Sequence, residues 1–142
     1  MMLHYTAGLL CLLPLMACAT AAAPDSSFRV EVIRAESVEQ IDSVPAPALT
    51  IAERRLQVHG FIGLGATGYE LVPTGMVEHG VIELLITPRM PEEMAGLTVL
   101  TRYEYRLTTG LLEPGSYAVR LRHARDGDVD PVVAFEGRIV VE

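Results

Sequence analysis

The chain contains no lysine. Its 11 basic residues are all arginines and stand against 18 acidic residues, which gives a formal net charge of −7. Proteins that bind nucleic acids present a basic surface, and proteins attracted to anionic lipid present a polybasic segment. The sequence has neither feature, so we expect no nucleic-acid partner, and any attachment to a membrane must come from acyl chains.

Cysteine is nearly as scarce. The two cysteines, Cys11 and Cys18, both lie near the start of the chain. From residue 28 onward there is none, which excludes a disulfide, a thiolate metal site and a thiol nucleophile from that part. Exported domains often carry disulfides because their compartments are oxidising. We therefore expect this domain to be held by its core alone; a chain of this size buries roughly two-thirds of its unfolded surface.

A long apolar run is missing at the start of the chain. The run Ala7–Met16 has about 10 residues, whereas a bilayer span takes roughly 20. The run ends within Leu15-Met16-Ala17-Cys18, where Leu lies three positions before the cysteine and Ala directly before it. This arrangement resembles the lipobox of bacterial lipoproteins. The resemblance implies that the chain is cut before Cys18 and that the Cys18 thiol carries diacylglycerol.

We accordingly predict a lipoprotein signal peptide over residues 1–17, a lipidated cysteine with a flexible tether over 18–27, and one domain over 28–142. The predicted location is the bacterial cell envelope, on the periplasmic or surface side of the outer membrane if the cell has two membranes. Two alternatives remain open. The signal is either an ordinary one that releases a soluble secreted protein, cut at Ala17-Cys18-Ala19, or an uncleaved anchor.

The rest of the sequence alternates apolar and polar residues in short runs separated by Gly and Pro. Such alternation is typical of strands with one buried face. We predict strands at 28–32, 55–62, 69–72, 80–87, 97–107, 116–123 and 132–141. The range 38–50 gives no single interpretation, and 91–96 is the one range that favours a helical turn. About seven short strands with frequent turns predict an all-β, antiparallel sandwich.

One segment adds a resemblance. Leu112–Val119, read as LEPGSYAV, resembles the Leu-x-Pro-Gly-x-Tyr-x-Val pattern of immunoglobulin-like and fibronectin type III-like sandwiches. In those domains the tyrosine packs at a corner with its hydroxyl bonded to upstream backbone. Pro114 and Gly115 match a type II turn that delivers Tyr117 to the core. The range 98–120 is also similar to a poorly characterised group of bacterial lipoprotein domains, without that group's two cysteines. Both resemblances imply a fold and no activity.

The sharpest polar cluster is Asp126, Asp128 and Asp130. Alternating aspartates begin an EF-hand-like loop, where their carboxylates bind Ca²⁺. The remainder departs from that pattern, because Pro131 stands where the loop needs Gly and Gly137 where it needs Glu. We interpret the cluster as a solvated hairpin loop in preference to a weak metal site.

No other metal or cofactor site is predicted. His59, His79 and His123 show no short spacing that favours a metal. The glycine-rich range 60–68 lacks the helix that a nucleotide fingerprint needs after it. We interpret that range as an inter-strand loop that contacts a partner through Phe61, Ile62 and Leu64.

A basic strip is predicted from Arg102, Arg106, Arg120 and Arg122, which we expect on two neighbouring strands together with Glu104. Cross-strand ion pairing is the first interpretation of this strip. An anion-binding surface is the alternative.

No enzyme is predicted. Ser116 belongs to the turn before Tyr117, and the chain has no Gly-x-Ser-x-Gly nucleophile motif. The sequence favours a non-enzymatic, lipid-anchored interaction or structural module of the envelope. The alternative is a small inhibitor of an exported protease that acts through loops at one end of the sandwich; a hydrolase is the least favoured.

Replacement of Cys18 tests the anchor. Cys18→Ser should move the protein from the membrane fraction to the soluble fraction, because the serine hydroxyl is not acylated. The measurement is cell fractionation followed by immunoblotting, with Cys11→Ser as the matched control that stays with the membrane. Identical fractionation of the Cys18→Ser and unmodified proteins, once signal cleavage is established, contradicts the lipoprotein prediction.

Overall fold

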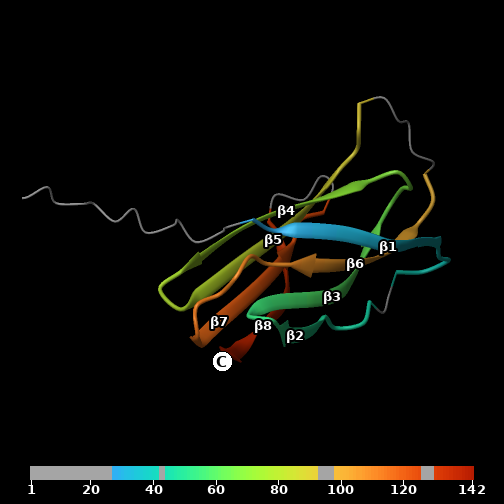
Figure 1. Cartoon of the computed structure of the whole chain (residues 1–142). Helices are drawn as coiled ribbons and strands as arrows, with labels where there is room; N and C mark the ends of the chain where they lie inside the picture. The colour runs from blue at the N-terminus through green and yellow to red at the C-terminus, as the bar shows by residue number, and fades with distance from the viewer. Residues whose placement is uncertain (1–26, 42–43, 93–97, 126–129) are drawn as a thin grey trace, which may run out of the picture.

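The computed structural model describes residues 27–41, 44–92, 98–125 and 130–142, so the predicted signal peptide and most of the tether lie outside the described residues. The described chain forms two four-stranded sheets that face each other (Figure 1). The strands are β1 (Arg29–Ser37), β2 (Ala48–Ala52), β3 (Arg55–Leu64), β4 (Glu70–Glu78), β5 (Val81–Arg89), β6 (Thr101–Thr108), β7 (Gly115–His123) and β8 (Val132–Val141). The prediction of an all-β sandwich is confirmed. No described segment is a helix long and apolar enough to cross a membrane.

The first sheet has the order β1-β6-β3-β2 and the second the order β4-β5-β7-β8. All neighbouring pairs are antiparallel except β5 and β7, which run parallel from Val81↔Ala118 to Ile86↔His123. The prediction of a fully antiparallel sandwich is therefore wrong at this pair. Parallel neighbours need a crossover connection, and here β6 provides it by crossing to the opposite sheet between β5 and β7.

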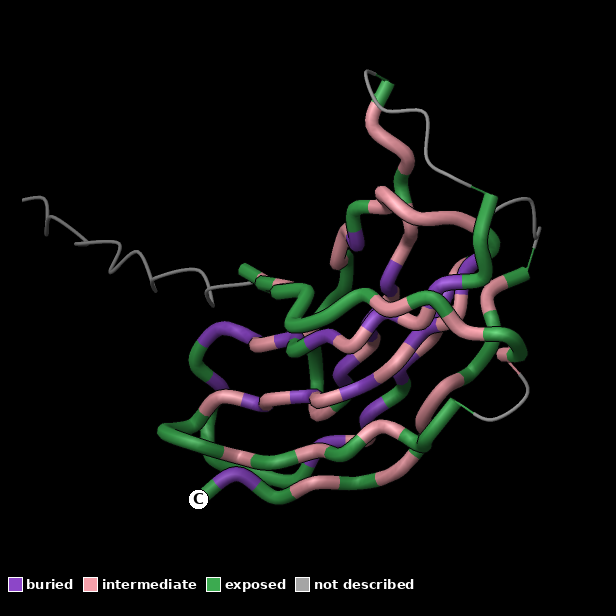
Figure 2. The backbone as a smooth tube through the Cα atoms, turned by 90° about the vertical axis from the view of Figure 1, so that its right-hand side faces the viewer, coloured by how far each residue is buried: buried purple, intermediate pink, exposed green. Residues whose placement is uncertain are grey.

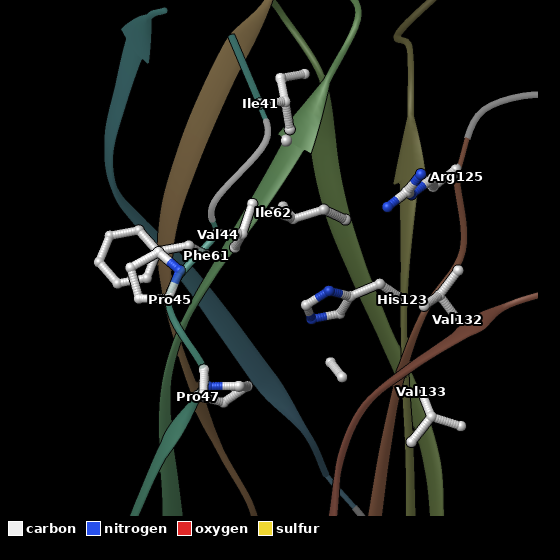
Figure 3. Close-up of a pocket in the computed structure, with 13 residues that line it drawn as sticks. Ile41, Val44, Pro45, Pro47, Phe61, Ile62, His123, Arg125, Val132 and Val133 are labelled. Atoms are coloured by element: carbon white, nitrogen blue, oxygen red, sulfur yellow. The ribbon is translucent and has the colours of Figure 1, made fainter.

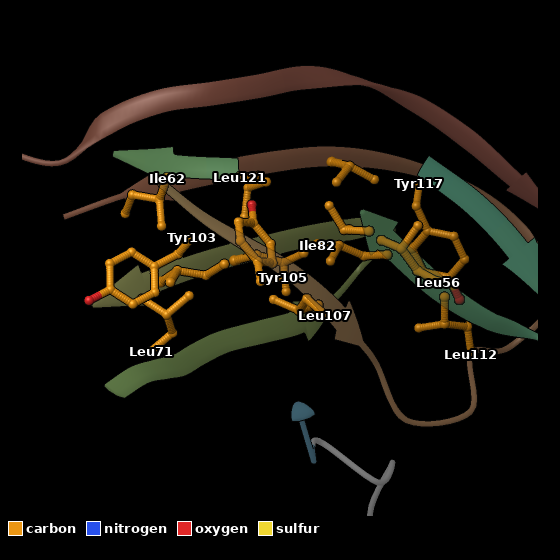
Figure 4. Close-up of a cluster of buried hydrophobic side chains, with 14 of the residues drawn as sticks. Leu56, Ile62, Leu71, Ile82, Tyr103, Tyr105, Leu107, Leu112, Tyr117 and Leu121 are labelled. Atoms are coloured by element: carbon orange, nitrogen blue, oxygen red, sulfur yellow. The ribbon is translucent and has the colours of Figure 1, made fainter. Parts of the chain in front are cut away.

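Every second residue of the central strands faces the core, as the alternation predicts (Figure 2). The core consists mainly of aliphatic side chains around three tyrosines (Figure 4). Its members from β3, β5, β6 and β7 include Leu56, Val58, Ile62, Leu64, Ile82, Leu84, Ile86, Tyr103, Tyr105, Leu107, Tyr117, Val119 and Leu121. Val99 is the exception to the predicted pattern: β6 begins only at Thr101, so Val99 precedes the strand and is 38% exposed.

Several strand boundaries differ from the predictions. β1 continues to Ser37, five residues beyond the predicted strand at 28–32. β4 continues through Pro73, whereas the predicted strand ends at residue 72. Proline is tolerated here because β4 is an edge strand, where a residue without an N–H need not cost a hydrogen bond to the neighbouring strand. β3 continues to Leu64 because residues 57–64 pair with β6. β2 lies at the end of the range that gave no single interpretation. Most of the predicted helical turn, residues 93–96, lies outside the described residues.

Tyr117 occupies the corner that the resemblance implies. Its ring is 8% exposed, and its hydroxyl donates a 2.6 Å hydrogen bond to the carbonyl oxygen of Glu113. The turn itself differs from the type II prediction. Gly115 has φ = 152°, far from the value of about +80° that a type II turn requires, because Gly115 already pairs with Val141 as the first residue of β7. This region of φ still favours glycine.

The corner is also tied to the opposite sheet. The N–H of Leu112 donates to the carbonyl of Arg54 at 2.8 Å, and Arg54 Nε donates to the carbonyl of Leu112 at 2.9 Å. Arg54 lies in the β2–β3 turn with φ = 58°. The segment before β7 is thus held between the sheets.

Truncation of Tyr117 should destabilise the domain in two steps. Tyr117→Phe removes the hydroxyl and leaves the Glu113 carbonyl without its partner, which should cost about 1–3 kcal/mol. Tyr117→Ala adds a cavity and should cost about 3–5 kcal/mol. Urea denaturation measures both values. Leu111→Ala, at a side chain that is 52% exposed beside the corner, is the control and should change stability by less than about 0.5 kcal/mol. A Tyr117→Ala protein as stable as the control would refute the corner's role.

Candidate functional site

The two lateral sides of the sandwich differ. On one side the edge strands β1 and β4 contact each other. On the other side β2 pairs only with residues 55–59 of β3. Pro45 and Pro47 precede β2, and proline cannot donate to a strand ladder, so in the described part of the chain the remainder of β3 has no strand neighbour on this edge. We call this side, between β2 and β8, the open side.

A cavity of about 320 Å³ lies on the open side (Figure 3). The segment before β2, the exposed edge of β3, the end of β7 and the start of β8 surround it. Its lining residues are Ile41, Val44, Pro45, Ala46, Pro47, Phe61, Ile62, Gly63, His123, Arg125, Val132, Val133 and Ala134. All except His123 and Arg125 are apolar or glycine. We call this cavity the side pocket.

A buried hydrogen bond lies beneath the side pocket. The hydroxyl of Tyr105, whose side chain is fully buried, is 2.7 Å from Nε2 of His123, which is 9% exposed. The two rings meet edge to face at 5.6 Å between centroids. Tyr105 belongs to β6 and His123 to β7, so this bond links the two sheets. Gly60 makes it possible, because a Cβ at that position would overlap the Tyr105 hydroxyl.

Both partners of this bond are uncharged at neutral pH. Burial, with the nearby positive charge of Arg125, lowers the pKa of His123 to about 4. Burial also raises the pKa of Tyr105 well above its usual value. Among the described residues the Tyr105 hydroxyl has no other acceptor for its proton, and a buried unpaired donor is costly. Tyr105 therefore donates to Nε2, which leaves the imidazole proton of His123 on Nδ1.

Two donors that have no partner among the described residues thus border a cavity whose other described lining residues are glycine or have apolar side chains. Nδ1–H of His123 has no partner among the described residues. Arg125 follows β7, and its side chain points into the side pocket from the same side as that of His123 (Figure 3). It likewise forms no ion pair or hydrogen bond that involves the described residues. The arrangement can bury an apolar group and bond an acceptor oxygen attached to that group.

The predicted contact loop is mostly strand. Phe61, Ile62 and Leu64 belong to β3, where they pair with β6, and Ile62 and Leu64 are each only 3% exposed. Only residues 65–69 connect β3 to β4. The prediction of a loop here is wrong: Phe61 and Ile62 lie in the strand that the alternation predicted at 55–62, and Leu64 belongs to β3 because that strand ends two residues later than predicted. The loop on which the protease-inhibitor alternative was based is therefore shorter than predicted and does not contain Phe61, Ile62 or Leu64. Phe61 and Ile62 line the side pocket instead.

The predicted basic strip is divided between two faces. Arg102 and Arg106 lie on β6 and Arg120 and Arg122 on β7, and these strands belong to opposite sheets. The prediction of neighbouring strands is wrong, because β6 is the crossover between the two strands of the parallel pair.

Arg102, Arg120 and Arg122 do form cross-strand ion pairs, but with glutamates other than the predicted Glu104. On the first sheet Arg102 pairs with Glu36, whose pKa the arginine lowers. Arg102 also stacks over the Phe61 ring at 5.7 Å. On the second sheet Arg120 pairs with Glu136 at 3.2 Å. Such exposed pairs contribute little to stability.

The other candidate residues do not converge. His59 bonds Glu104 at 2.7 Å on the outer face of the first sheet, and His79 lies in the exposed β4–β5 turn. Within the described ranges no three His, Cys, Asp or Glu side chains group as metal ligands. Asp126 and Asp128 lie outside the described residues, and Asp130 is exposed. Ser116 is an exposed residue of β7.

No protein-family model matches the chain, and no curated protein or solved structure shows significant similarity to it.

The Tyr105–His123 pair was not predicted. The sequence did indicate that His123 is buried, because it follows Tyr117, Val119 and Leu121 at the next inward position of the same strand.

The buried histidine predicts a dependence of stability on pH. In the unfolded chain His123 takes up a proton as the pH falls below about 6.5, whereas in the folded protein it does so only near 4. The free energy of unfolding should therefore fall by up to about 3 kcal/mol between these values and be fully retained above them. Denaturant titrations across this range should show a flatter profile for His123→Gln.

The exposed His79 supplies the control for this measurement. Its side chain is 88% exposed, so His79→Gln should keep the pH profile of the unmodified protein. Equal profiles for His123→Gln and His79→Gln would mean that His123 is not a buried neutral group.

Proposed function

We propose that this chain is a non-enzymatic, lipid-anchored envelope protein that binds small monocarboxylates with an apolar body in the side pocket. Cys18 is its proposed anchor, on the lipobox resemblance alone. The observation that carries the binding function is the position of Arg125 and His123 on a cavity whose other described lining residues are glycine or have apolar side chains.

The walls of the side pocket select the apolar body of the ligand. Val44, Val132 and Val133 are 38%, 46% and 49% exposed, which is unfavourable for large aliphatic side chains in water. A ligand chain that covers them removes apolar surface from water. The volume of about 320 Å³ is at the lower end for ligand pockets, so the ligand is a short chain or a small ring.

The two donors select the head group. The guanidinium of Arg125 binds a carboxylate through charge-assisted hydrogen bonds. Nδ1–H of the neutral His123 adds a second donor without adding a second charge. The described residues that line the side pocket include no carboxylate that would repel the ligand and no hydroxyl or thiol nucleophile. This composition favours binding over catalysis.

Titration with three simple probes tests the proposal. Octanoate should shift the NMR amide resonances of the residues that line the side pocket. Acetate, which keeps the charge without the body, and octanol, which keeps the body without the charge, should bind far more weakly. The Cys18→Ser protein is the sample of choice, because detergent micelles would absorb octanoate. Arg125→Gln should weaken octanoate binding about tenfold or more, as expected for loss of a charged hydrogen bond.

Arg106→Gln is the matched control. Arg106 is exposed on β6 and does not line the side pocket, so its replacement should leave octanoate binding unchanged. Equal affinity for octanoate and octanol, or an Arg125→Gln protein that binds octanoate as tightly as the Arg106→Gln protein, would refute the proposed ligand class.

A further inference from the structure

The four edge strands of the sandwich differ in how they are protected against pairing with another strand. β1 carries a bulge between Val32 and Arg34 and contacts β4. β2 has only five residues and follows two prolines, and β4 contains Pro73. Bulges, prolines and short lengths all prevent strands from pairing at a sheet edge.

β8 lacks most of this protection. It is a ten-residue edge strand without proline, and β7 is its only paired neighbour among the described strands. Its one irregularity lies near its start, where the register with β7 shifts between Leu121 and Arg122 and leaves Ala134 unpaired. The regular part, Phe135–Val141, presents a free backbone edge on the open side. Val140 on its outward face is 64% exposed.

We propose that β8 pairs with β8 of a second copy of this chain. The two strands run antiparallel about a two-fold axis at Gly137 and join two four-stranded sheets into one of eight strands. Such a contact is isologous, since the same strand is used by both copies. The inference rests on the edge of β8 and its charges, not on the side pocket or its ligand.

Charge selects this register. Glu136 and Arg138 point outward on either side of Gly137. An axis at Gly137 places Glu136 directly opposite the second copy's Arg138, and the symmetry repeats the pair. An axis at Glu136 would oppose two glutamates, and one at Arg138 would oppose two arginines; like charges directly opposite destabilise a sheet. Arg138 forms no ion pair within the described chain, so its guanidinium is available.

The inward face is compatible with the same register. Phe135 lies opposite the buried Leu121, and Ile139 opposite the buried Tyr117, so both point toward the core. Each is only partly buried. With the axis at Gly137, Phe135 faces the second copy's Ile139, and both lose exposed apolar surface. The opposite-charge pairs on one face and the apolar pairs on the other coincide only in this register.

Two charge reversals and their mixture test the proposal. Sedimentation equilibrium of the full chain in density-matched detergent should show a monomer–dimer equilibrium. Arg138→Glu and Glu136→Arg should each raise the dimer dissociation constant about tenfold or more, since each puts like charges opposite twice. An equimolar mixture of the two variants should form heterodimers, because every cross-strand pair is then of opposite charge. Arg106→Glu, the same charge change on the other sheet, should dimerise as the unmodified chain does.

Circular dichroism melting establishes that each variant is folded before its dimer dissociation constant is compared with that of the unmodified chain. This control matters most for Glu136→Arg, which also loses the ion pair between Glu136 and Arg120. If that variant does not fold, Arg138→Glu mixed with Glu136→Gln replaces it, with partial recovery of the dimer expected. Three results would overturn the proposal: an unmodified chain that stays monomeric throughout a concentration series, an Arg138→Glu chain that dimerises like the unmodified one, or a mixture of folded variants that stays monomeric.

Discussion

The hydrogen bond between Tyr105 and His123 is the interaction on which the functional side of this sandwich depends. It is a polar link between the two sheets within a largely apolar core. Because it is buried, both rings stay neutral, and because Nε2 accepts, Nδ1–H is left for the side pocket. Gly60 belongs to the same unit, since any side chain there would displace the tyrosine hydroxyl. One bond thus sets the spacing of the sheets and the chemistry of the cavity beside them.

The open side follows from a second constraint, the prolines before β2. Pro45 and Pro47 prevent the segment from extending β2 along β3, so among the described residues β2 pairs with only part of β3, whereas β1 and β4 contact each other on the opposite side. The segment instead passes over β3, where Gly63 gives room to Ile41. The side pocket lies between this segment and β8, and the far edge of β8 has no paired neighbour among the described strands. The side pocket and the proposed dimer contact occupy different parts of that side, the start of β8 and its regular second half.

The sequence predicted the strands better than it predicted their arrangement. Alternation located the core residues of β3, β5 and β7 because one buried face leaves a period of two in the sequence. The order of strands in the sheets depends on contacts between distant segments, which no local pattern encodes, and the parallel β5–β7 pair was missed for that reason. The divided arginine strip is a direct consequence, because β6 and β7 follow each other in sequence yet lie in opposite sheets. The sequence analysis considered His123 only as a metal ligand and rejected that role, although its inward position on the strand already indicated burial.

The most direct test of this account is the state of the His123 ring. Long-range ¹H–¹⁵N NMR distinguishes the protonated ring and its two neutral tautomers. The account predicts a neutral ring with its proton on Nδ1 from about pH 5 to 8, where an exposed histidine titrates, and a shift of the Nδ1 resonance when octanoate is added. A ring that titrates near its ordinary pKa of 6.5 and does not respond to octanoate would contradict both the buried bond and the binding site built on it.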